Sequence, residues 1–227
     1  MSALNLRLIT APVIEPVSLS SMKQFLSLDS GNNLDDGLIM AFITAARQYA
    51  ESYTNRVFFN QTWQLTLANF PFWIPNTTVG SSKDFYNGQY WIKQSAIRFS
   101  KPSLVSVTSI TYVNTIGTTI TLDPSTYLVD PTQEPGIVAP VQSYCWPSSQ
   151  IFMPGSVKAT FVAGSYGDGV TVNTIPQTIN VAIQLLVSTW YANREGTSGN
   201  QLSVIPFGVR VLLDTVKFHC FDFGSQG

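Results

Sequence analysis

Residues 35–67 read DDGLIMAFITAARQYAESYTNRVFFNQTWQLTL, and the spacing of apolar residues changes from helical to extended within this stretch. The first part carries apolar side chains at spacings of three and four: Leu38, Phe42, Ala45, Tyr49 and Tyr53. This spacing predicts an amphipathic helix, with Asp35 and Asp36 in its capping turn and an end near Asn55. From Phe59 onward apolar and polar residues alternate, which predicts a strand with one covered face.

Further helices and strands are predicted on both sides of this stretch. Upstream, residues 4–9 are extended, and Ser18 is a suitable N-cap for a short helix over residues 19–27. Downstream, β patterns separated by glycine and proline cover residues 105–112, 118–122, 127–130, 136–139 and 156–163, which we expect to complete one small sheet. Two more helices are predicted over residues 177–194 and 206–216. Because the strands form one block between helices, the sequence predicts an α+β fold.

This order of segments predicts a helical base with a β domain inserted between its two long helices. Residues 1–56 are expected to form the N-terminal part of the base and residues 165–216 its C-terminal part. The inserted antiparallel β domain is expected over residues 57–164. Residues 217–227 follow the last periodic segment and contain three phenylalanines, so we expect a docked arm rather than an exposed apolar tail.

The charge content is low for a protein that exists as a free monomer. Charged residues make up 11% of the chain, whereas an ordinary soluble domain has about 25%. Such a chain either hides much of its surface against partners or has a neutral, Ser/Thr-rich β surface. The net charge is −1 and the basic residues are scattered singly, so sequence-specific nucleic-acid binding is not expected. Nor do we expect a secretion signal or a membrane span.

Few side chains are suited to catalysis. The single histidine, His219, lies beside Cys220 in the tail, where a third group to orient a Cys–His pair is not expected. With one histidine and only one further cysteine, Cys145, a zinc site within one chain is not expected. We therefore predict no enzyme activity, no catalytic residues, no cofactor and no metal.

Two other features have structural interpretations that are simpler than chemical ones. Asp35 with Asp36, and Asp123 with Asp130, could bind a hard cation, but aspartate is also the usual residue at caps and turns. The glycine-rich residues 164–169 lack the Gly-Lys-Ser/Thr of a phosphate loop, so we predict a flexible connection between sheet and helix.

Aromatic residues are the remaining candidates for contact chemistry. Between residues 70 and 99 they alternate with Asn, Ser, Gly and Pro, and the predicted partner-contact residues are Phe72, Trp73, Phe85, Tyr86, Tyr90 and Trp91. This mixture is typical of recognition surfaces, although the same rings could fill the core of a small sheet.

Several runs of residues, taken in order, resemble one family over nearly the whole chain. These runs are LRLIT and EPVSL near the start, residues 35–56, QTWQLTLANFP at 61–71, TLDPSTYLVD at 121–130, PGIVAP with CWP within 135–147, FVAGSYG with residues 175–195, and PFGVRVLLD at 206–214. In this order they are similar to the head-tail connector (adaptor or head-completion) proteins of tailed phages, in the longer branch with a β insertion. Residues 72–98 and the tail after Asp214 depart from the family's pattern.

The resemblance implies a structural role in the neck of a virion assembled in the host cytoplasm. About twelve copies would form a ring beneath the portal protein, extend the DNA channel and present a platform to the next neck or tail protein. DNA would pass through without sequence-specific binding. By family precedent the C-terminal segment grips the portal, and the residues expected to do so are Phe218, Phe221 and Phe223, supported by Leu212 and Leu213.

Two other functions remain open from the residues alone. The first is a phage tail or baseplate module that binds a carbohydrate or protein through the aromatic insertion, with Trp73, Tyr90 and Trp91 as stacking platforms. The second is a hydrolase with an unrecognised site, which the lack of a well-placed general base disfavours.

Overall fold

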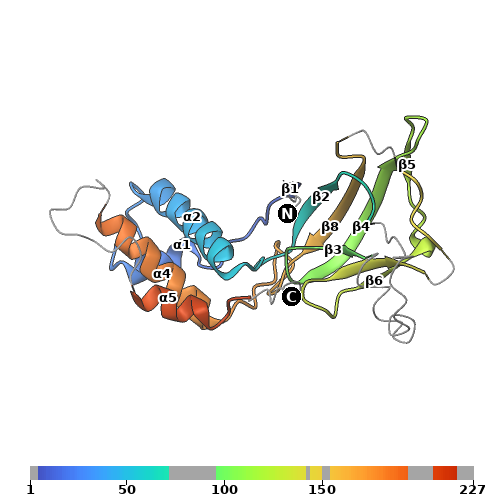
Figure 1. Ribbon diagram of the computed structural model, residues 1–227. Coiled ribbons are helices and arrows are strands. Elements are labelled where there is room, and N and C mark those ends of the chain that lie inside the picture. Colours follow the sequence, from blue (N-terminus) through green and yellow to red (C-terminus); the bar gives the residue numbers. More distant parts are fainter. Residues whose placement is uncertain (1–4, 72–95, 142–143, 150–153, 194–206, 219–227) are drawn as a thin grey trace. The chain divides into compact units, whose positions relative to one another are not determined.

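The computed structural model describes residues 5–71, 96–141, 144–149, 154–193 and 207–218, and these divide into two compact units. The sheet unit comprises residues 1–11 and 61–164, and the helical unit comprises residues 12–60 and 165–227. The chain therefore passes between the units three times, at residues 11–12, 60–61 and 164–165. Figure 1 shows the strands of one unit and the helices of the other.

The described part of the sheet unit contains two antiparallel sheets. The larger has the order β1 (Asn5–Thr10), β2 (Gln61–Leu67), β8 (Val157–Ala163), β4 (Leu104–Val113) and β5 (Thr119–Thr121). The smaller has the order β3 (Ile97–Arg98), β7 (Ile137–Pro140) and β6 (Tyr127–Asp130), the last preceded by the 3-10 helix η1 (Pro124–Thr126). The expectation of a single small sheet is therefore wrong: β6 pairs with β7, not with β5.

The core of the sheet unit lies along the central strand β8. Its residues alternate between buried and more accessible, as expected for a strand covered on one face. Phe161 is fully buried, lies opposite Trp63 of β2 and Val107 of β4, and its ring centre is 4.4 Å from that of Phe99. Because Phe99 follows β3 directly and its N–H donates to the carbonyl of Gly136, this contact packs the smaller sheet on the larger one.

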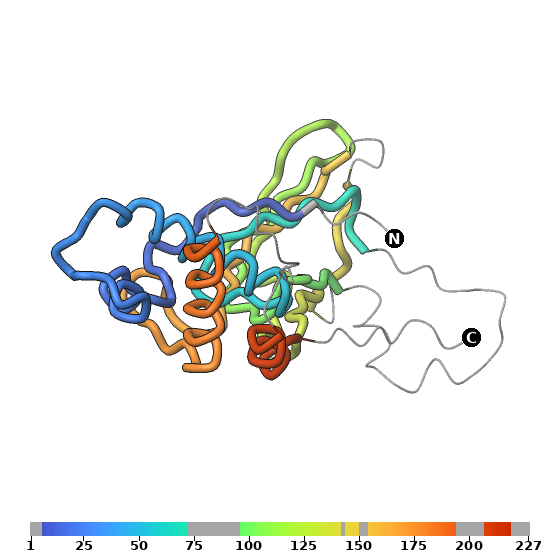
Figure 2. Tube along the Cα trace, turned by 90° about the vertical axis from the view of Figure 1, so that its left-hand side faces the viewer, coloured from blue at the N-terminus to red at the C-terminus, as the bar shows by residue number. Residues whose placement is uncertain are grey.

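The helical unit contains α1 (Leu19–Phe25), α2 (Asp36–Thr54), α4 (Gln177–Ala192) and α5 (Phe207–Asp214) among its described residues. Ser18 caps α1 as predicted, its Oγ accepting from the N–H of Ser21 at 3.2 Å. α2 ends at Asn55, which adopts the left-handed conformation with φ of 54°. α2 packs against α4, and α4 packs against α5; in Figure 2 α5 is the red helix beside α4 in orange.

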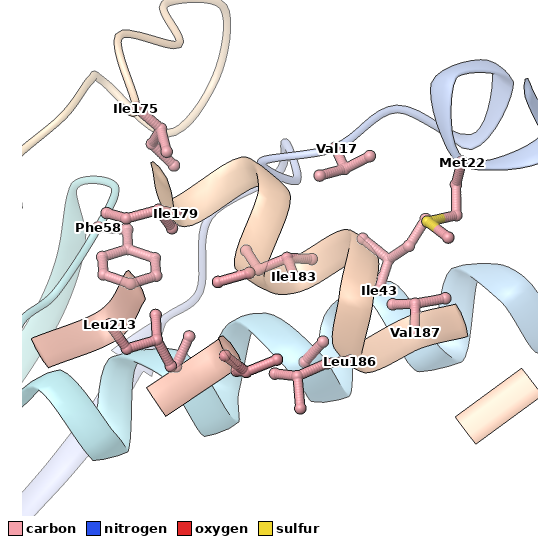
Figure 3. Close-up of a cluster of buried hydrophobic side chains, with 14 of the residues drawn as sticks. Val17, Met22, Ile43, Phe58, Ile175, Ile179, Ile183, Leu186, Val187 and Leu213 are labelled. Atoms are coloured by element: carbon pink, nitrogen blue, oxygen red, sulfur yellow. The ribbon is translucent and has the colours of Figure 1, made fainter. Parts of the chain in front are cut away.

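One apolar cluster holds these helices together. Figure 3 shows Phe58, Ile179 and Leu213 at one end of it, and Met22 and Ile43 at the other. Phe58 and Phe59 belong to this core and are fully buried. The strand that was predicted to begin at residue 59 therefore begins only at Gln61, because the two phenylalanines are occupied in the helical core.

The α+β prediction is confirmed, with the strands from β2 to β8 lying between α2 and α4 in the chain. The start of the chain differs from the predicted division, in which residues 1–56 belong to the helical base. β1 pairs with β2 over Asn5 to Thr10, so the first strand lies in the sheet unit. Pairing of these distant segments is a non-local contact that a local pattern does not reveal.

The segment between β8 and α4, predicted to be a flexible connection, is instead densely hydrogen-bonded. Asp168 accepts from the backbone N–H groups of Val170, Thr171 and Val172 at 2.8–2.9 Å. The Gly169 carbonyl accepts from the N–H of Val13 at 2.7 Å. Gly167 has φ of 142°, and an added Cβ would clash with the Val172 carbonyl oxygen, so glycine is required there.

Asp168 is expected to make the order of this loop pH-dependent. Hydrogen bonds from the backbone of Val170, Val172 and Thr171 hold the pKa of the carboxyl well below its usual range. Because the folded pKa is depressed, the stabilisation is complete above the ordinary aspartate pKa of about 4 and is lost as the pH falls below it. In Asp168→Ala, amide exchange at 170–172, corrected for intrinsic rates, should be several-fold faster at pH 7 and lack this dependence. Equal protection in both proteins at pH 7 would contradict this role.

Candidate docking surfaces

Several charged side chains of the helical unit form ion pairs within that unit. Lys23 is 5% exposed, and its Nζ lies 2.6 Å from Asp36 Oδ1 and donates to the Asn32 carbonyl at 2.9 Å. α4 contains no charged residue, and the charged residues of α2 are Asp36, Arg47 and Glu51, all of which are paired. The low charge content of the chain therefore leaves long neutral faces on these two helices.

A second such arrangement is a nearly buried three-residue ion network. Arg47 donates through Nε to Glu15 at 2.8 Å and through Nη1 to Glu51 at 2.9 Å. The side chains are only 5%, 14% and 12% exposed, respectively. Thr44 also donates to Glu15, and Glu51 accepts from the N–H of Phe58, so every group of the network has a partner. The network is satisfied within the chain and has a structural role.

The outward positions of α2 carry neutral side chains. The exposed residues along the helix are Gly37, Leu38, Met40, Ala41, Ala45, Gln48 and Ser52. Because a helix places residues three and four apart on one face, much of this set forms a continuous neutral strip. Burying such a strip against a partner requires no desolvation of charge.

α5 carries apolar residues both on the side that faces the helical core and on its exposed side. Val209 and Leu213 are fully buried in the helical core, and Leu212 is half-buried against it. Phe207 and Val211, one turn apart, are 81% and 48% exposed. Leu213 was grouped with the predicted docking residues, but its burial makes it a support for α5. The exposed apolar residues that the structure does show on this helix were not predicted.

The residues that follow α5 are held against the end of α2, and we call residues 214–218 the arm root. The N–H of Phe218 donates to the Thr54 carbonyl at 2.8 Å, and Arg56 donates through Nε to the Val216 carbonyl at 2.9 Å. The Arg56 guanidinium carbon lies 5.6 Å from the centre of the Phe218 ring. Phe218, predicted as a docking residue, is thus half-buried at the start of the tail.

A second set of contacts joins the arm root to α2 one turn earlier. The hydroxyl of Tyr53 donates to Asp214 at 2.9 Å, and Lys217 Nζ lies 4.5 Å from the centre of the Tyr53 ring. The hydrogen bond to Asp214 raises the pKa of Tyr53 above its usual value. These groups are separated by about 160 residues in sequence, so no local pattern could have indicated that they meet.

Most of the other predicted contact residues lie outside the described residues. This holds for all six aromatics of the insertion, Phe72, Trp73, Phe85, Tyr86, Tyr90 and Trp91, and for Phe221, Phe223, His219 and Cys220. Three described aromatics of the sheet unit contact one another: Phe70 stacks on Trp146, with ring centres 5.0 Å apart, and meets Tyr112 edge-on at 5.6 Å.

The described residues contain no arrangement suited to catalysis. A hollow of about 320 Å³ beside the start of α4 is lined mainly by neutral polar side chains, including Ser18, Ser21, Asn180 and Gln184. Glu15, the carboxylate in its lining, is engaged by Arg47. Within the described ranges, no group of three or more His, Cys, Asp or Glu side chains could hold a metal ion. No helix there has both the length and the hydropathy needed to cross a membrane.

No protein-family model matches this chain, and no curated protein matches it in sequence. Solved structures do match its fold. A chain of the neck of an empty gene transfer agent (GTA) particle, computed with C6 symmetry, is 17% identical with a TM-score of 0.66, covering 93% of this chain and 94% of that chain. A chain of the virion of a native GTA particle is 15% identical with a TM-score of 0.65, covering 94% and 95%.

A chain of the neck of a native GTA particle, computed with C12 symmetry, is 17% identical, with a TM-score of 0.56 and coverage of 93% and 94%. Because each match covers nearly all of this chain and nearly all of the matched chain, the likeness extends over both the helical unit and the sheet unit. The fold of this chain is therefore one that occurs in the necks and virions of GTA particles.

Proposed function

We propose that this chain is a structural, non-enzymatic subunit of the neck of a phage-like particle, in which it forms a ring beneath the portal. The observation that carries the proposal is its fold, shared over 93% of its length with a chain of a GTA neck at a TM-score of 0.66. The order of its sequence segments, similar to that of head-tail connector proteins, supports the same conclusion independently.

The surface of the helical unit is suited to such a ring. A closed ring of identical subunits uses two different faces of each subunit, so both flanks become buried. The neutral strip of α2 can be buried without removing charge from water. On α5 the exposed Phe207 and Val211 add apolar surface, with the exposed Arg210 beside them. A ring of about twelve copies is compatible with the C6 and C12 symmetries of the matched necks, because six divides twelve.

DNA passage and portal docking complete the proposed role. The net charge of −1 and the scattered basic residues would let DNA slide through the channel, since a ring of basic side chains would retain phosphates. The portal is gripped by the tail, with Phe221 and Phe223 beyond the arm root as the contact residues. A downstream neck or tail protein binds the opposite side of the ring.

Truncation after Phe218 tests this role. Removing residues 219–227 should abolish docking to the portal protein of the same particle, because it removes the contact residues but none of the arm root contacts to α2. Negative-stain microscopy of the full-length chain mixed with portal should show rings of about twelve copies or stoichiometric decoration of the portal. The truncated chain should show neither decoration nor any change in circular dichroism.

The matched control is Thr115→Ala, at an exposed position of the turn between β4 and β5, which should dock as the unaltered chain does. A full-length chain that stays monomeric and never associates with the portal would overturn the proposed function. Undiminished docking of the truncated chain would move the portal contact to another part of the molecule.

A further inference from the structure

The arm root is fixed to α2 before any partner is present, and one side chain contributes more to this than the others. The Tyr53 contact with Asp214 is exposed, whereas the hydrogen bond from Arg56 to the Val216 carbonyl is partly buried. Arg56 also lies over the Phe218 ring, so one guanidinium holds the arm root at two points. Arg56 is thus the principal clamp on the arm root.

The end of α2 is built to receive the returning chain. The left-handed Asn55 stops the helix, so the Thr54 carbonyl does not accept from a further helical turn and instead accepts from Phe218. The N–H of Phe58, which a continuing helix would direct to Thr54, donates to Glu51. Both groups at the helix end are therefore satisfied only in the presence of the arm root and the ion network.

We propose that Arg56 is a positioning residue for docking: it makes the arm leave the helical unit from one place, beside the end of α2. This inference rests on the proposed function, because it concerns how the tail meets the portal. Phe221 and Phe223 follow Phe218 by three and five residues, so their Cα atoms lie within about 11 and 18 Å of that of Phe218. Fixing Phe218 therefore confines both contact residues to a small volume.

The clamp also reduces the entropy that docking must overcome. Ordering a segment on binding costs conformational freedom, and residues 215–218 are already ordered by Arg56 and Thr54. Without the clamp these residues would be ordered only at docking, and the contact residues would explore a larger volume around the portal site. Their effective concentration there would be lower.

The inference is tested by replacing Arg56 and measuring both the clamp and the docking. In Arg56→Ala the amide of Phe218 should exchange at least about tenfold faster, and the affinity for the portal should fall about tenfold. The thermal midpoint of the free protein should stay unchanged. Arg56→Lys should be intermediate, because an ammonium lacks the planar group that bonds a carbonyl and lies over a ring together.

Inserting Gly-Gly between Phe218 and residue 219 provides a matched second variant. It keeps the clamp, so Phe218 should remain protected, but it lengthens the chain between Phe218 and the contact residues and should weaken docking several-fold. This variant decides the question if Arg56→Ala lowers the thermal midpoint. Portal affinity within about twofold of normal in Arg56→Ala, with Phe218 exchange raised, would overturn the inference. An unchanged affinity in the insertion variant would do the same.

The truncated chain separates failure of this inference from failure of the proposed function. If truncation after Phe218 abolishes docking while Arg56→Ala and the insertion do not weaken it, the arm docks but Arg56 does not position it. If truncation itself leaves docking intact, the tail is not the portal contact.

Discussion

Arg47→Ala is expected to lower the stability of the helical unit by about 3–5 kcal/mol. The substitution leaves Glu15 and Glu51 nearly buried, at 14% and 12% side-chain exposure, without their shared cation. Two carboxylates that have lost their counterion in a poorly solvated site either bear the cost of desolvation or rearrange the helix that carries them. Because the chain consists of two compact units, the change should be measured locally, by hydrogen exchange at amides of α2 and α4 under increasing denaturant.

The matched controls distinguish the charge from the packing. Arg47→Lys keeps the charge but cannot reproduce the donors to both glutamates, so it should lose less than Arg47→Ala. The triple change Glu15→Gln, Arg47→Met, Glu51→Gln should recover most of the loss, since neutral groups of similar size need no buried cation. A loss below about 1 kcal/mol in Arg47→Ala would show that water reaches the carboxylates.

Phe161→Ala is expected to cost the sheet unit about 3–5 kcal/mol. The ring is fully buried on the central strand, and it links the two sheets through Phe99 at 4.4 Å. Removing it leaves a cavity between the sheets that backbone hydrogen bonds on both sides of β8 keep from collapsing. Amide exchange in β2, β4 and β8 should increase under mild denaturant, and this is the quantity to measure.

The control for this change lies at the next position along the strand. Val162→Ala removes less volume from a half-buried site on the opposite face of β8, and should cost less than about 1.5 kcal/mol. Similar losses in the two variants would contradict the assignment of the core to the Phe161 face.

The features that the sequence predicted are those decided within a few turns of chain. The existence of α2, its end at Asn55 and the Ser18 cap are local, so they followed from the residues themselves. The buried face of α2 did not, because Leu38 and Ala45 of the predicted stripe are exposed. The fully buried apolar side chains of the helix are those of Ile39, Ile43, Ala46 and Ala50. The strands were found by their alternation, but their partners were not. That β1 joins β2, and that β6 and β7 form a separate sheet, depends on packing between segments far apart in the chain.

The candidate docking surfaces show the same limit. Apolar residues on α5 were expected to support docking, but a pattern alone does not distinguish the buried Leu213 from the exposed Phe207. Arg56 was not a candidate at all, because its partners Val216 and Phe218 are about 160 residues away. The low charge content of the chain was a better indication that neutral surface is available for contacts. The sequence did not show, however, that Lys23 and Arg47 form ion pairs within the helical unit.

The three crossings between the units affect how one unit can be exchanged for another in evolution or by design. Backbone hydrogen bonds join the three segments near these crossings. The N–H of Ser165 donates to the Val57 carbonyl at 3.0 Å, and the N–H of Asn60 donates to the Gly167 carbonyl at 3.0 Å. The N–H of Val13 donates to the Gly169 carbonyl at 2.7 Å. Since all three segments are already neighbours in the helical unit, a sheet of different size can be grafted there without stretching the helical core. The graft has to be made in two pieces, residues 1–11 together with 61–164, because β1 pairs with β2 but is separated from it in the chain by residues 12–60 of the helical unit. Recombination that replaced only the central piece would pair a foreign strand with β1, and this register constraint favours inheritance of the two pieces together.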